Sequence, residues 1–147
     1  MLTEIANTWY IVVSAAALYG LVASLGTWRL DASFKPLNGT FKSYDQLESV
    51  KGSINLNMTL AILLLVYAGM YLFFLMAMVG IGTLSFFTAT IYMATFSLAG
   101  FLCAKLWFLK VEKRAKATQV VSEDPRVRQT WERWLKEWKE LRLRLSD

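Results

Sequence analysis

The sequence predicts an all-α integral membrane protein with three transmembrane helices and a C-terminal cytoplasmic amphipathic helix. Hydrophobic residues make up 56% of the 147 residues, and charged residues only 18%. The 53 residues from 52 to 104 contain no Asp, Glu, Lys or Arg, whereas the surface of a soluble domain carries charge throughout. Because a membrane-spanning helix needs about 20 apolar residues, this stretch holds two spans and a turn.

The first predicted span, residues 8–28, is bracketed by Trp9 and Trp28. The two tryptophans are 19 positions apart, which corresponds to about 28 Å along an α-helix and is close to the hydrocarbon thickness of a bilayer. Tryptophan favours the headgroup region, so we predict that both residues are interfacial anchors. The short N-terminal segment 1–7 carries Glu4 and no Lys or Arg, which argues against a cleaved signal peptide.

Apolar runs and turn residues alternate along the rest of the chain. Glycines between the second and third spans supply the backbone angles of a tight turn, and Trp107 is the predicted anchor of the third span. Asp124 and Pro125 fit the N-cap and first position of the last helix. The predicted elements are a polar loop at 29–56, a second span at 57–79, the turn at 80–83, a third span at 84–108, a linker at 109–124 and an amphipathic helix at 125–145.

The distribution of positive charge predicts the orientation in the membrane. Three spans put the loop 29–56 and the C-terminal region on the same side of the bilayer. The loop holds four Lys and Arg residues and the region from Lys105 onward holds twelve, which together are all sixteen in the chain. The positive-inside rule therefore predicts that the N-terminus is outside and that the loop and the C-terminus are cytoplasmic.

Small residues in two of the spans predict close helix packing. Ala16, Gly20 and Ser24 recur every four residues in the first span, a spacing that lets another helix approach closely. Gly100 and Ala104 give a shorter version of the pattern in the third span. We interpret both as interfaces, within the chain or with another subunit; the alternative is the ordinary use of small residues in membrane helices.

Hydroxyl side chains are frequent in the third span. Thr88 and Thr95 are seven residues apart and therefore share a helix face. They could line a polar path or bond across helices. More often, Ser and Thr in membrane helices bond to their own backbone carbonyls, which favours a packing role.

The sequence offers few groups for catalysis or ion transport. It has no histidine, and none of its predicted spans carries an ionisable residue at mid-membrane depth, where pumps and small exporters need one. Neither a metal-ligand cluster nor a pair of acidic residues falls within the predicted spans. We therefore predict that the protein is not an enzyme and that it uses no cofactor and no metal.

The C-terminal helix is the most strongly patterned segment. One face is an apolar stripe with heptad-like spacing, and the other face is charged. The stripe can dock on another protein, lie on an anionic membrane surface or pair with a second copy of itself; its spacing and mixed charge favour a protein partner. Acidic residues interleave with basic ones, so nucleic acid is not an expected partner. The stripe consists of Val127, Trp131, Trp134, Leu135, Trp138, Leu141 and Leu145.

These features together predict a non-catalytic accessory or structural subunit of a larger multi-subunit membrane complex. Its spans would pack against other integral membrane subunits, and its C-terminal helix would dock on a protein or on the bilayer. The alternative is a homo-oligomeric pore lined by the Thr and Ser face of the third span, because uncharged pores gated by hydrophobic constrictions exist. A further alternative is a membrane-surface sensor or anchor that works through the C-terminal helix.

Overall fold

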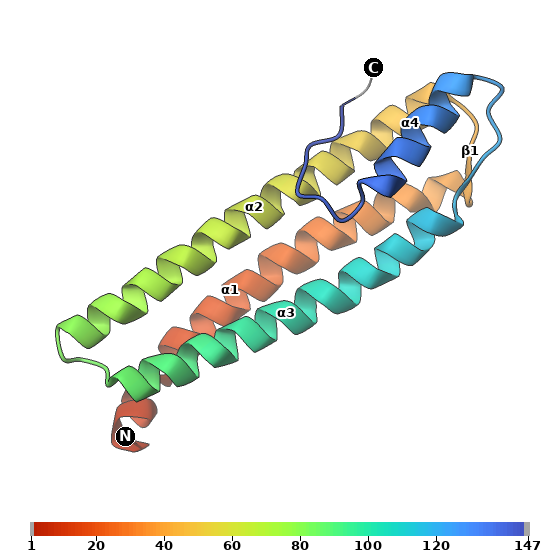
Figure 1. Cartoon of the computed structure of the whole chain (residues 1–147). Helices are drawn as coiled ribbons and strands as arrows, with labels where there is room; N and C mark the ends of the chain where they lie inside the picture. The colour runs from red at the N-terminus through yellow and green to blue at the C-terminus, as the bar shows by residue number, and fades with distance from the viewer. Residues whose placement is uncertain (1, 146–147) are drawn as a thin grey trace.

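The computed structural model describes residues 2–145, and most of them are helical. Three long helices run the length of the molecule: α1 (Leu2–Phe34), α2 (Tyr44–Gly80) and α3 (Phe86–Ala117). Each is long and apolar enough to cross a membrane, so the three predicted spans are confirmed at that level. Helix α1 packs against both of the others, while α2 and α3 contact each other much less (Figure 1).

The long helices extend beyond the predicted spans at one end of the molecule. Helix α1 continues past residue 28 to Phe34, α2 already begins at Tyr44, and α3 continues past residue 108 to Ala117. The predicted polar loop 29–56 is therefore mostly helical. The reason is tertiary: apolar residues recur with helical spacing in these extensions and are buried there, so the helices have a core to pack on outside the apolar spans.

The connections at this end are short and paired with each other. A 3₁₀ turn, η1 (Lys35–Leu37), leads into a turn at Asn38 and Gly39, both of which have positive φ angles of 47° and 78°. Strand β1 (Thr40–Phe41) then pairs in parallel with β2 (Gln119–Val120). This two-stranded ladder ties the α1–α2 connection to the chain that leaves α3.

The last helix, α4 (Pro125–Lys136), begins at the proline placed at its first position by the sequence. The Asp124 carboxylate caps it by accepting from the backbone N–H of Arg126 at 2.9 Å. The Arg126 side chain donates to the same carboxylate, which lowers the pKa of Asp124. The helix ends well before the predicted residue 145.

The segment 137–145 is irregular and folds back over α2 (Figure 1). The Asn55 side chain of α2 accepts from the Arg144 backbone N–H at 2.5 Å and donates to the Arg144 carbonyl at 2.9 Å. These two bonds pair the backbone N–H and carbonyl of Arg144 outside any helix.

Buried residues form two separate cores. One lies at the end where the helices extend, within residues 30–58 and 108–138. We call this end of the molecule, together with the segment 139–145 that folds over it, the head. The other lies among α1, α2 and α3 nearer the opposite end and includes Tyr71, Tyr92 and Phe96. The ring centroids of Tyr71 and Phe96 are 4.6 Å apart, so α2 and α3 do meet at this level.

Candidate functional site

The aromatic face of α4 packs on the chain's own helices. Trp131 and Trp134 are 2% and 1% exposed, and Trp138, just beyond the helix, is 2% exposed. The Trp131 ring centroid lies 4.8 Å from that of Phe41, and Trp138 lies 6.2 Å from Phe108. The tryptophans of the apolar stripe are therefore covered within the molecule, whereas the sequence pattern predicted a protein, a membrane surface or a second copy as their cover.

The structure brings together only part of the predicted stripe. Val127 is fully buried in the head core, and Leu135 packs against it while remaining partly exposed. Leu141 and Leu145 are 54% and 67% exposed. Because α4 ends at Lys136, the residues that follow no longer share its helical periodicity, and the last two leucines fall outside the core.

Ion pairs join the elements of the head. Asp31 of α1 accepts from Arg114 of α3 at 2.6 Å, and Glu112 pairs with Lys116 at 2.6 Å one turn along α3. In both pairs the acidic side chain is largely buried and the basic one is more exposed. The Asp31–Arg114 pair links two long helices, so it contributes to their alignment as well as satisfying a buried carboxylate.

Arg144 is the most deeply buried charged side chain of the head. Its guanidinium donates to the backbone carbonyls of Glu137 and Arg142. The Glu137 carboxylate lies 3.7 Å away. Burial lowers the pKa of Arg144, opposed by the nearby negative charge of Glu137, and arginine remains protonated in proteins. Arg144 thus holds the segment 137–145 closed on itself.

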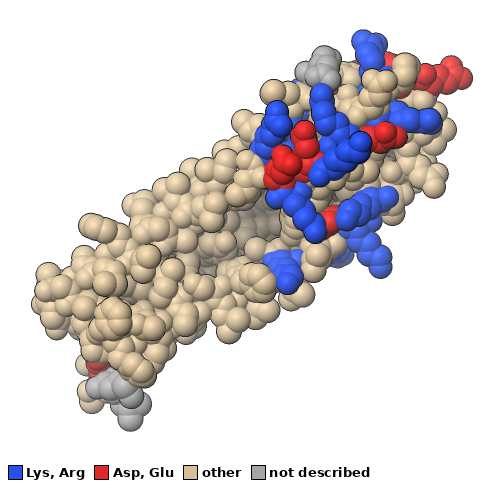
Figure 2. Space-filling view, in the orientation of Figure 1, with Lys and Arg blue, Asp and Glu red and all other residues tan. Residues whose placement is uncertain are grey.

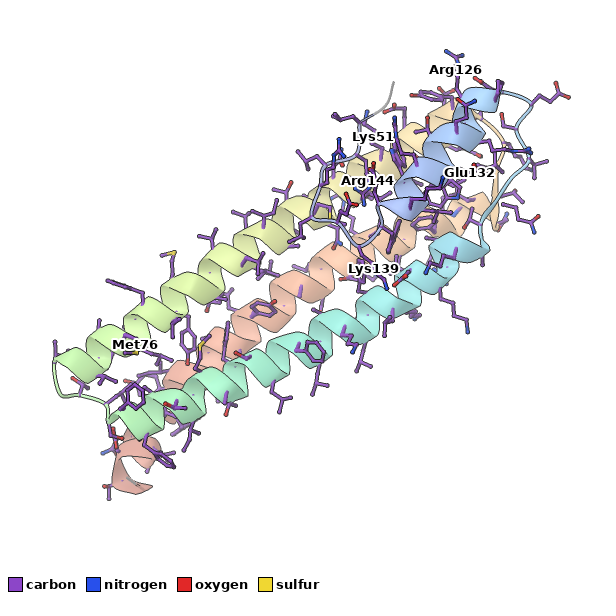
Figure 3. The ribbon with its side chains drawn as sticks, viewed as in Figure 1. Lys51, Met76, Arg126, Glu132, Lys139 and Arg144 are labelled. Atoms are coloured by element: carbon purple, nitrogen blue, oxygen red, sulfur yellow. The ribbon has the colours of Figure 1, made fainter. Side chains whose placement is uncertain are left out.

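The outer surface of the head is charged. Figure 2 shows Lys and Arg gathered at this end with Asp and Glu among them, and Figure 3 shows Arg126 and Glu132 on α4. We call the outward side of α4 and the segment after it the charged face. Its exposed members are Arg126, Arg128, Glu132, Lys136, Lys139, Glu140 and Arg142.

At the opposite end, Glu4 of α1 caps the first turn of α3. One carboxylate oxygen accepts from the backbone N–H of Ser85, and the other accepts from the Thr88 hydroxyl at 3.0 Å. Thr88 is fully buried, whereas Thr95 is exposed. The two threonines therefore do not line one open surface in this structure.

Replacing Glu4 by Gln should loosen the first turn of α3. Glutamine has one carbonyl oxygen and no charge, so it can replace only one of the two acceptors. We expect several-fold faster amide hydrogen exchange at Ser85 and Thr88, measured by mass spectrometry in detergent. The matched control is Asn7→Ala, an exposed change on the same helix; equal exchange in the two variants would argue against the cap.

The predicted packing residues are all at least partly buried by the chain itself. Ala16, Gly20 and Ser24 are half-buried on α1, and a Cβ at Gly20 would lie 3.9 Å from the Cys103 sulfur. Gly100 is buried, and a Cβ there would lie only 2.9 Å from the ring of Tyr19. Close α1–α3 approach therefore depends on the absence of a side chain at position 100.

A second close approach, which the small-residue pattern does not predict, lies at Gly26. A Cβ at this position would lie 2.9 Å from Leu60 and 3.0 Å from the Asn57 side chain, so it is here that α1 approaches α2 most tightly among the glycine positions. Its neighbours four residues away on α1, Val22 and Leu30, are large. The repeating small-residue signal used for the first span is therefore absent around Gly26.

The three predicted interfacial anchors all face outward. Trp9, Trp28 and Trp107 are 54%, 58% and 40% exposed. The Lys110 ammonium lies 5.5 Å from the Trp107 ring centroid, a cation–π distance. Trp28 and Trp107 border the head, and Trp9 lies near the opposite end of α1; their place at the membrane interfaces stays a prediction.

An apolar groove of about 540 Å³ runs between α2 and α3, beneath the segment 137–145. Figure 2 shows it as a hollow next to the charged end of the molecule. We call it the α2–α3 groove. Small residues on the long helices leave this space, and Lys105, Lys139 and Glu140 stand among its lining residues. Ala104, one of the predicted packing residues, also lines it.

The groove could not be found from the sequence, because it results from the separation of two helices that are both packed on α1.

Between residues 2 and 145 there is no group of three or more His, Cys, Asp or Glu side chains that could hold a metal ion. Comparisons with protein-family models, with curated proteins and with solved structures find no match to this chain.

Proposed function

We propose that the protein is a non-catalytic accessory subunit of a larger membrane complex, with its head on the cytoplasmic side. The observation that carries the proposal is the way α4 is used. Its tryptophan face is buried in the head core, and its charged face is left on the outside. Such a helix completes a folded scaffold and presents a surface of mixed charge to a partner.

The orientation follows from where the basic residues lie. All sixteen Lys and Arg residues belong to residues 29–51 and 105–144, at the head end of the long helices (Figure 2). Basic residues next to membrane spans are retained in the cytoplasm. The opposite end of the molecule carries Glu4 and no basic side chain among the described residues.

The burial of the tryptophans favours a protein partner over the membrane surface. A helix that lies on a bilayer inserts its apolar face among the lipids, but Trp131, Trp134 and Trp138 are already covered by the chain itself. On the charged face, acidic and basic side chains alternate closely. This pattern suits pairing with a protein surface of complementary charge more than with a uniformly anionic membrane surface.

The buried charged groups support a structural role in the same way. Asp31 and Glu112 are paired with basic residues, and Arg144 is bonded to the backbone of its own segment. Each therefore holds the fold together.

On the outside of the spans, α2 presents apolar residues and Gly69 has open space around it, so this surface is free to contact lipid or other subunits.

The proposal is tested by extracting the tagged full-length protein from its own membrane in a mild detergent. We expect native mass spectrometry to show it in a complex of discrete mass, with other subunits at fixed stoichiometry. Reversing charge on the outer side of α4, by Arg128→Glu with Lys136→Glu, should lower the occupancy of one soluble or membrane subunit. The matched control, Lys35→Glu with Lys42→Glu, makes the same change in net charge at the α1–α2 connection.

Two outcomes would overturn the proposal. The first is a protein that extracts alone or only as a ring of identical copies, which would favour the pore hypothesis. The second is a complex whose composition responds equally to both double variants, because the charged face of α4 would then have no particular role.

A further inference from the structure

We infer that the α2–α3 groove binds one anionic glycerophospholipid, with an acyl chain in the groove and its phosphate between Lys105 and Lys139. The inference goes beyond the proposed function and does not depend on it, because it requires only that the three long helices cross a bilayer. Three features lead to it: the apolar lining and length of the groove, its closure at both ends, and the basic side chains at the head end.

The groove has the lining and dimensions of an acyl-chain site. Its volume of about 540 Å³ falls within the range of small-molecule pockets, and its walls are mainly aliphatic and aromatic. Along α2 it extends from Asn57 to Ala68 and along α3 from Met93 to Phe108, which corresponds to about 17 and 22 Å of helix. The depth of one leaflet is about 15 Å, so the groove is long enough for the part of a lipid that lies in one leaflet.

Both ends of the groove are closed by the protein. At the head end, residues 138–141 lie among its lining residues and cover it. Towards the middle of the spans, Tyr71 and Phe96 bring α2 and α3 into contact. A transmembrane helix of a partner would need about 30 Å of open groove and an exit past the head. The closed groove therefore fits a lipid chain, which ends near mid-membrane, and does not fit a spanning helix.

The charges at the head end select the headgroup. Lys105 and Lys139 are exposed lining residues, and neither forms an ion pair with another residue of the described chain. Glu140 is the one acidic side chain in the lining, so the net charge here is positive. Figure 3 shows Lys139 between the segment after α4 and helix α3, whose residues line the same groove. Two ammonium groups favour a lipid headgroup with a net negative charge over one in which a cationic group already neutralises the phosphate.

The level of these lysines along the spans also fits a headgroup. Trp107 is two residues beyond Lys105 and is exposed at the predicted interface. The Lys105 ammonium lies 4.8 Å from the Phe101 ring centroid, so its stem follows the apolar wall and its charge stays near the rim. Trp138 also lines this end of the groove.

The experiment is a lipid titration of the full-length, delipidated protein, followed by native mass spectrometry. We expect one molecule of phosphatidylglycerol to bind tightly and phosphatidylcholine to bind more weakly. Lys105→Gln with Lys139→Gln should lower the affinity for phosphatidylglycerol about tenfold or more, since each lysine near a membrane surface adds to the attraction of anionic lipid. The matched control is Lys42→Gln with Lys113→Gln, which removes two exposed positive charges away from the groove.

A second pair of variants tests the groove itself. Ala61→Phe fills the space between the helices and should abolish the bound lipid, whereas Ala94→Phe adds the same side chain at an exposed position of α3 outside the groove and should not. Should Ala61→Phe fail to fold, the lysine variants still decide, because both lysines are exposed.

Three results would overturn the inference. Equal binding of both lipids would remove the selection by charge, and equal losses in the two lysine double variants would show attraction to the whole basic surface only. Displacement of a co-purified protein by Ala61→Phe, with lipid binding unchanged, would assign the groove to a protein segment.

Discussion

Replacing Trp131 by Ala is expected to release α4 and the segment 137–145 from the head core and to leave the long helices in place. Trp131 is 2% exposed at the centre of the head core, with ring centroids at 4.8 Å from Phe41, 6.0 Å from Phe34 and 6.4 Å from Trp134. Truncating a buried tryptophan costs about 3–5 kcal/mol. That exceeds what the short helix α4 can recover elsewhere, because an isolated helix of its length is marginal in water.

The measurement is limited proteolysis of the detergent-purified protein, read together with circular dichroism. Cleavage should appear in the chain between α3 and α4 and in the segment 137–145, while most of the helical signal remains. Arg128→Ala, on the outward side of the same helix, is the control and should leave the cleavage pattern unchanged. An intact head in the Trp131 variant, combined with loss of a partner subunit, would instead make the tryptophan face a docking surface between chains.

Replacing Gly100 by Leu is expected to destabilise the packing of α1 on α3, while the same change at Gly69 is expected to be neutral or slightly stabilising. A Cβ at position 100 would lie 2.9 to 3.3 Å from three ring atoms of Tyr19, but a Cβ at position 69 meets nothing within 4 Å. Both changes remove a glycine from a helix, which by itself favours folding by about 0.5–1 kcal/mol. Overpacking at position 100 opposes this with about 1–3 kcal/mol or more.

In the same detergent, Gly100→Leu should therefore lower the thermal unfolding midpoint, whereas Gly69→Leu should leave it unchanged or raise it slightly. Tyr19 is held edge-on against Phe96 at 5.4 Å, so its ring has little freedom to move aside. Equal midpoints for the two variants would mean that α1 and α3 do not pack as closely at Gly100 as the structure has them.

Local and compositional features could be predicted from the sequence because they depend on few neighbours. The charge-free stretch and the apolar runs predict three helices that can span a membrane, and the structure has three such helices. Asp124 and Pro125 mark the start of α4, as their capping pattern predicts. Each of these outcomes follows from the residue itself or from those within one helical turn.

The use of the aromatic stripe could not be read from its pattern. A heptad-like row of tryptophans shows that one face of a helix will be covered, but another protein, a membrane and the chain's own helices can all cover it equally well. The structure places that cover within the chain, because α1, β1 and α3 bring Phe34, Phe41 and Phe108 to the same place.

By itself the sequence determined the number of potential spans, the gathering of positive charge at one end and the start of the last helix. Only the tertiary structure decided how far the helices continue, where the last one ends and where the α2–α3 groove lies. Helix extension depends on a core assembled from residues 30–58 and 108–138. The groove depends on two helices that both pack on α1 and diverge from each other. Contacts between segments that are distant in the sequence decide these features, so the periodicity of a single segment does not predict them.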